Sequence, residues 1–225
     1  MTDIVTIVEE IRETSAELSR MEDLIAENPS HPSLLLDFES LSKRKKNLEE
    51  QFSAIADQRH VDICSYRLIP DGVGRFSINA LTNSLRDFQS AFTLAFDSVK
   101  SEIPKLRGRV SADIVDQSTF DFAYSYPGSL GFVFTMPNER LLFGGSDLDV
   151  AMDLVFSLIE AKSSDEIRTC AAKAGIPAVR RIHDWAKDHA QHNMNVEIQW
   201  RRKQEIRSSV KMQVPELRDL QNVIE

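Results

Sequence analysis

The first 58 residues carry large apolar side chains at intervals of seven. In residues 3–26 this row consists of Ile4, Ile11, Leu18 and Ile25, and in residues 33–57 of Leu34, Leu41, Leu48 and Ile55. A heptad row keeps one stripe of a helix facing a partner helix. The stretch between them, ENPSHPS, contains two prolines, which cannot continue a helix. The pattern therefore predicts an antiparallel helical hairpin of the coiled-coil type over residues 1–58.

Beyond residue 60 the pattern changes to short strands and amphipathic helices. Strand-like alternation covers 61–69, 119–126, 129–136, 140–143, 195–200 and 205–214. Helical periodicity covers 77–99, 147–161, 164–174 and 177–191, and it resumes at Pro215. Because these elements are interspersed without a βαβ rhythm, we predict an α+β body with a mostly antiparallel sheet over residues 61–225. The apolar helical pattern at the end of the chain leaves open whether the body is truncated at its C-terminus.

Composition and charge narrow the class of protein. The chain has 225 residues, is 42% hydrophobic and carries a formal net charge of -8. An acidic body disfavours nucleic acid as a partner. No apolar run approaches the roughly 18 residues of a membrane span, and the start lacks the features of a signal peptide. With Cys64 and Cys170 as two unpaired thiols, we expect a cytoplasmic protein that does not engage a membrane.

The run Lys43 to Lys46 stands out within the second heptad row, where Lys45 occupies a seam position. Such a run is typical of a solvated helix face on which one lysine extends its stem along the seam. The alternative is a small basic patch for phosphate or for an acidic partner.

The stretch FGGSDLDVAMD, residues 143–153, resembles the Gly-Ser turn and Asp-x-Asp pair with which nucleotidyltransferases hold a metal ion. In those enzymes the two parts lie on separate elements, whereas here Ser146 and Asp147 are adjacent and helical spacing follows. We therefore predict that Ser146 caps a helix whose first turn contains Asp147 and Asp149. Ser146 and Asp149 have the spacing of a capping box.

A second candidate for anion binding lies in PDGVGRFS, residues 70–77, between a predicted strand and a predicted helix. Glycines let backbone N–H groups approach an anion, and a helix N-terminus adds partial positive charge. The candidate residues are Gly72, Gly74, Arg75 and Ser77. The match is partial, because the third glycine of a dinucleotide motif and the lysine of a P-loop are missing. An ordinary strand-to-helix turn has the same composition.

Other chemistry is indicated only weakly. Asp188, His189 and His192 share a sector of one predicted helix, but the sequence offers no further ligands to complete a zinc site. His189 also flanks an apolar stripe, which predicts a histidine at the edge of the core. Cys64 lacks an activating neighbour, and WRRKQEIR at 200–207 has the composition of a hairpin as well as of a nucleic-acid contact. We expect no metal and no cofactor.

The hairpin is the clearest functional signal. Consecutive leucines at its turn spread over an arc too wide for one partner helix to cover. We therefore expect a non-enzymatic interaction protein that oligomerises with itself or docks another protein. The predicted interface consists of Ile4, Ile11, Leu18, Leu34, Leu35, Leu41 and Leu48. The alternative is a regulatory module that binds a nucleotide or another anion at residues 70–77 within a larger complex.

Overall fold

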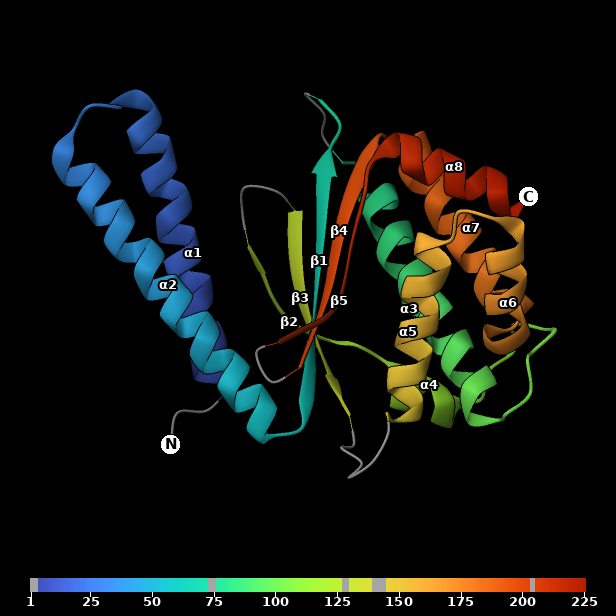
Figure 1. Cartoon of the computed structure of the whole chain (residues 1–225). Coiled ribbons are helices and arrows are strands. Elements are labelled where there is room, and N and C mark those ends of the chain that lie inside the picture. Colours follow the sequence, from blue (N-terminus) through green and yellow to red (C-terminus); the bar gives the residue numbers. More distant parts are fainter. Residues whose placement is uncertain (1–3, 73–75, 127–129, 139–144, 203–204) are drawn as a thin grey trace.

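A five-stranded antiparallel sheet separates an N-terminal helical hairpin from a layer of helices (Figure 1). The computed structural model describes residues 4–72, 76–126, 130–138, 145–202 and 205–225. Its helices are α1 (Ile4–Glu27), α2 (Pro32–Gln58), α3 (Ile78–Lys100), α4 (Ala112–Ser118), α5 (Asp147–Glu160), α6 (Ser164–Ala174), α7 (Ile176–Gln191) and α8 (Val214–Ile224). Its strands are β1 (Val61–Pro70), β2 (Asp121–Tyr126), β3 (Leu130–Pro137), β4 (Met194–Arg202) and β5 (Glu205–Met212).

The sheet has the strand order β2-β3-β1-β4-β5, with every neighbouring pair antiparallel. The central strand β1 places Cys64 opposite Phe134 of β3 and Trp200 of β4. Along β4 buried and half-buried residues alternate, so the two faces of the sheet differ in polarity. Val196, Ile198 and Trp200 are buried, whereas Glu197 and Gln199 are half-buried.

The main core lies between the sheet and helices α3, α5, α6, α7 and α8 (Figure 1). Helix α3 contributes Phe88 and Phe92, which stack on Phe120 at ring-centroid distances of 5.9 and 4.9 Å. Trp185 of α7 and Trp200 of β4 are fully buried in the same cluster. The amphipathic stripes predicted from the sequence therefore converge on one face of the sheet.

The boundaries of α7 follow from local sequence signals. Gly175 ends α6 with a φ of 83°, in the left-handed region that favours glycine. A Cβ atom at this position would lie 2.8 Å from the carbonyl oxygen of Lys105, so the close approach also requires glycine. Pro177 occupies the first turn of α7.

The predicted α+β class and the positions of the long elements are confirmed, with two exceptions. Helix α4 was not predicted, because only seven residues form it and they show little apolar periodicity. The strand predicted at 140–143 lies outside the described residues.

Helix α2 leads into the central strand through a very short junction. Only Arg59 and His60 separate α2 from β1. His60 has a φ of 57°, and its carbonyl oxygen accepts a hydrogen bond from the backbone N–H of Asn138 at 2.9 Å. The hairpin is therefore connected directly to the middle of the sheet.

Candidate docking site

The base of the hairpin packs on the sheet face opposite the main core. A second apolar cluster joins the two helices to β1, β2 and β3, and its buried members are Ile7, Ile11, Leu48, Phe52, Ala56, Ile63, Tyr124 and Val133. Phe52 meets Tyr124 edge-on, with ring centroids 5.6 Å apart. Arg12 of α1 donates a hydrogen bond to the carbonyl oxygen of Ala123 at 2.6 Å. The base is thus fixed to the body by apolar and polar contacts.

The distal half of the hairpin, residues 19–47, extends away from the sheet (Figure 1). Every residue in this range is at least partly exposed, whereas Leu18 and Leu48 at its ends are buried. Its large apolar side chains are Met21, Leu24, Ile25, Leu34, Leu35, Leu36, Phe38 and Leu41. Of these, Leu24, Leu35 and Leu36 are 45%, 46% and 66% exposed. The described contacts of the chain leave these three side chains open to solvent.

The seven residues predicted as an interface fall into two groups. Ile11, Leu18 and Leu48 are buried within the chain, and half-buried Ile4 packs against the second apolar cluster. In the distal half, Leu34 and Leu41 are half-buried and Leu35 is exposed. The second group remains accessible at the surface. Leu24 and Leu36 belong with it although they lie off the heptad row, which is why the row alone did not select them.

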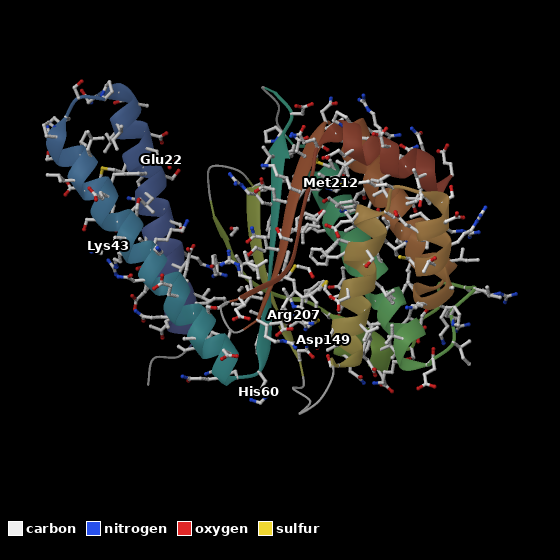
Figure 2. The ribbon with its side chains drawn as sticks, in the orientation of Figure 1. Glu22, Lys43, His60, Asp149, Arg207 and Met212 are labelled. Atoms are coloured by element: carbon white, nitrogen blue, oxygen red, sulfur yellow. The ribbon has the colours of Figure 1, made fainter. Side chains whose placement is uncertain are left out.

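Charge is unevenly distributed along the distal half. Residues 22–39, the acidic tip, contain five carboxylates, which belong to Glu22, Asp23, Glu27, Asp37 and Glu39. The basic band, Lys43 to Lys46, lies within α2, shortly after the acidic tip. Figure 2 shows Lys43 on the side of the hairpin away from the sheet, and Glu22 on the side toward it. Arg44 pairs with Glu10 at 3.7 Å, and Lys45 pairs with Glu49 at 3.8 Å.

The space between α2 and the uncovered part of the sheet is polar. A cavity of about 240 Å³ lies there, lined among others by Glu49, Ser53, Arg67, Glu197 and Arg201. Across the strands, Glu197 pairs with Arg67 at 3.3 Å and with Lys211 at 2.6 Å. The hairpin base therefore covers the apolar part of this face and leaves a charged part open.

Only part of the candidate anion-binding site at residues 70–77 lies within the described residues. Gly74 and Arg75 lie outside the described residues. Gly72 has a φ of 95° in an exposed turn, which explains the glycine without a ligand. The hydroxyl of Ser77 accepts a hydrogen bond from the backbone N–H of Ala80 at 3.1 Å and caps α3. Ser77 thus already has the role of an ordinary helix cap.

The predicted capping box at the start of α5 is confirmed. Ser146 Oγ accepts a hydrogen bond from the Asp149 N–H at 3.1 Å, and Asp149 Oδ2 accepts one from the Ser146 N–H at 3.0 Å. Asp147 is exposed in the same turn. The stretch from Gly145 onward is therefore a helix start, while Phe143 and Gly144 lie outside the described residues.

Asp149 has a further role that the sequence did not reveal. Its carboxylate is buried beside that of Asp62, and Arg202 donates hydrogen bonds to both. Asn138 also bridges them, with its Nδ2 atom 2.8 Å from an oxygen of each. Figure 2 shows Asp149 and Arg207 close together, and their charged atoms are 3.1 Å apart. Two buried carboxylates are thus neutralised by two arginines.

The surroundings of Asp149 favour its ionised form. Burial alone would raise the pKa of Asp149, but hydrogen bonds from Arg202, Asn138 and the Ser146 backbone lower it to about 2. Trp200 Nε1 donates to Asp62 at 3.0 Å, and Arg207 lies over the Trp200 ring at 4.5 Å. Because these partners come from β1, β4, β5, α5 and the segment after β3, the cluster ties the sheet to the helical layer.

The histidines predicted as weak metal candidates do not converge. His189 is fully buried, deeper than the core-edge position predicted, whereas His192 is exposed. His189 Nδ1 donates to the Trp185 carbonyl oxygen at 2.7 Å, and its Nε2 atom lies 3.1 Å from Ser84 Oγ. Burial lowers the pKa of His189 to about 4. Within the described residues, no group of three His, Cys, Asp or Glu side chains could hold a metal ion.

Two other candidates are also enclosed. Cys64 is buried, and burial raises its pKa to about 12, so the thiol stays protonated. Trp200, which could stack on a base only from the surface, is fully buried. Ser84 and His189 have the contact of a nucleophile and its base, but both are fully buried.

A further groove lies along the edge strand β5. It has a volume of about 860 Å³ between α5, the edge strand β5 and α8. Apolar residues such as Ile159, Val210 and Leu220 line it together with Lys162, Glu216 and Asp219. Its charges are mixed in sign, so it favours no particular class of ligand.

Comparison of the chain with models of protein families, with curated proteins and with solved structures gives no significant match. Among the described residues, no helix is both long and apolar enough to cross a membrane. The features with the strongest implication for function are therefore the exposed apolar residues and the divided charge of the distal half.

Proposed function

We propose that this chain is a non-enzymatic assembly protein of the cytoplasm, which uses the distal half of its N-terminal hairpin to associate with another protein chain. Self-association is the form that we favour. The observation that supports it is the exposure of Leu24, Leu35 and Leu36 on an extension whose base is fixed to the body.

Physical chemistry supports this reading of the hairpin. Burying a large aliphatic side chain is worth about 1.5 to 3 kcal/mol relative to leaving it in water. Scattered exposed leucines are normal on a protein surface, but these lie within one short segment that protrudes. A second protein surface would recover this free energy, and closed symmetric assemblies are the most common solution among soluble oligomers.

We propose a non-enzymatic role because the reactive groups described above are buried or bound by arginines. The Ser84–His189 pair is enclosed in the main core, and the Cys64 thiol is buried and protonated. The carboxylates of Asp62 and Asp149 are bound by arginines rather than open to a substrate. These groups stabilise the fold.

The test compares the mass in solution of three proteins by light scattering. The variant Leu35→Gln, Leu36→Gln removes exposed apolar surface but keeps charge and helix propensity. The control Leu106→Gln makes the same change at a leucine of the body that is 77% exposed. We expect a dimer or larger species for the unaltered chain and the control, and a shift toward monomer for the double variant.

A monomeric unaltered chain at tens of micromolar would exclude self-association. Docking to a different protein would then be the remaining form of the proposal.

The alternative function, anion binding at residues 70–77, stays a prediction. It is tested by thermal denaturation with added nucleotides, because a ligand that binds only the folded state raises the melting temperature.

A further inference from the structure

The acidic tip and the basic band have a symmetry that suggests a specific partner. On α2, Glu39 lies two residues before Leu41, and Lys43 lies two residues after it. Leu36 and Lys46 lie five residues before and after the same leucine. Leu36, Glu39, Lys43 and Lys46 are all exposed, and their spacing of three, four and three residues places them on one face of the helix. We call these four residues the outer stripe.

We propose that the partner of the hairpin is a second copy of this chain, whose α2 lies antiparallel against this α2 along the outer stripe. This inference rests on the proposed function and specifies its geometry. In an antiparallel pair centred on Leu41, a residue before the centre faces the residue equally far after it in the other copy. Glu39 of each copy then faces Lys43 of the partner copy, and Leu36 covers the aliphatic stem of Lys46.

The charges favour this arrangement over the other symmetric ones. Contact between the two tips end to end, or side by side in parallel, would bring the carboxylates of the acidic tip against each other. In the antiparallel pair, Glu39 and Lys43 of the two copies instead alternate in sign around the two-fold axis. Leu36 of each copy supplies the main apolar contact, while the charges select the register, as is general for exposed ion pairs at interfaces.

The intrachain contacts leave the outer stripe available. The ion pairs of Arg44 with Glu10 and of Lys45 with Glu49 involve the two members of the basic band that are outside the stripe. Lys43 lies on the side of the hairpin away from the sheet (Figure 2), so a second copy can approach it without displacing the body.

The experiment uses charge reversal in the full chain, with the dimer Kd measured by analytical ultracentrifugation at low salt. Glu39→Lys alone places two lysines against each other at each contact, and Lys43→Glu alone places two glutamates there. We expect each single variant to raise the dimer Kd by about tenfold, since an attraction becomes a repulsion at both contacts of the dimer.

Two matched controls restore the opposite charges. The double variant Glu39→Lys, Lys43→Glu exchanges the charges at unchanged net charge, and should regain the original Kd within about threefold. A mixture of the two single variants should form heterodimers in preference to either homodimer. Circular dichroism of all variants checks that the helix content is unchanged, because Glu39 and Lys43 are also neighbours four apart on one helix.

The outcomes separate this inference from the proposed function. If the chain dimerises through Leu35 and Leu36 but all charge variants share one Kd, or the exchange fails to restore it, the antiparallel register is wrong and the docking role stands. If the unaltered chain is monomeric, the second copy is excluded as a partner.

Discussion

Arg202 of β4 donates two hydrogen bonds to the carboxylate of Asp62 on β1, of 2.8 Å from Nε and 2.7 Å from Nη2. Asp62 is 1% exposed, and the same guanidinium also binds Asp149 from α5. Replacing Arg202 by methionine therefore leaves two buried carboxylates short of their main counter-ion. Loss of one partner from a buried ion pair costs about 3 to 5 kcal/mol, and we expect a loss of unfolding free energy in that range.

Urea denaturation measures this change, and the neighbouring Arg201→Met provides the control. Arg201 is exposed, so its replacement should alter stability by less than about 0.5 kcal/mol. Equal effects of the two substitutions would contradict a special role for Arg202.

Ser146→Ala should destabilise the protein by more than the loss of a helix cap alone. The hydroxyl of Ser146 caps α5 and also donates to Asn138 Oδ1 at 2.6 Å. A lost cap costs about 1 kcal/mol, and loss of the second hydrogen bond adds roughly another 1 kcal/mol. Ser163, which caps α6 through the Glu166 N–H at 3.3 Å, provides the matched control. Thermal denaturation of both alanine variants should show the larger drop for Ser146; a smaller one would contradict the shared role.

His189 should make stability depend on pH between about 6.5 and 4. Its pKa is about 4 in the folded protein and 6.5 ordinarily, so within this window the unfolded chain binds the extra proton. Stability that is fully present above pH 6.5 is therefore lost as the pH falls. A shift of this size corresponds to about 3 kcal/mol for this fully buried group.

The measurement is urea denaturation across that pH range for the unaltered chain, His189→Gln and the exposed control His192→Gln. The difference between the unaltered chain and His189→Gln should shrink as the pH falls, whereas the control should keep the original pH dependence. Parallel curves for all three proteins would be evidence against a buried neutral imidazole.

Phe52→Ala should loosen the hairpin from the body without unfolding the main core. Phe52 is 2% exposed in the apolar cluster under the hairpin base, and removing a buried phenylalanine costs about 3 to 5 kcal/mol. We expect faster amide hydrogen exchange in α1 and α2, while α3 and α7 stay protected. Leu106, which is 77% exposed on the body, is the control, and its alanine variant should leave exchange in the hairpin nearly unchanged.

Local signals explain how much of the fold was predictable. The two N-terminal helices and the Ser146 cap follow from signals within a few residues, and both were correctly placed from the sequence. The charged cluster depends instead on residues far apart in the chain, such as Arg202 and Asp62 at a separation of 140 positions. Neither residue has a neighbour in sequence that marks it as buried.

The same distinction applies to the candidate docking site. The heptad row predicted both helices. It continues from Leu18 to Ile25 without a change in residue type, although Leu18 is buried and Ile25 is only half-buried. What decides burial at the base is contact with Ile63, Tyr124 and Val133 on three strands, and this register becomes visible only in the folded chain.

The junction between α2 and β1 has a mechanical consequence. Helix α2, of 27 residues, is about 40 Å long and joins the central strand through Arg59 and His60 alone. A load applied at the distal end of such a rod acts as a torque on its base, with Phe52 and Tyr124 near the pivot. The strand that receives this torque is hydrogen-bonded on both edges, so it is the part of the sheet best able to resist it. Force on the hairpin therefore enters the body mainly through its central strand, and the contact of Phe52 with Tyr124 passes part of it to the edge strand β2.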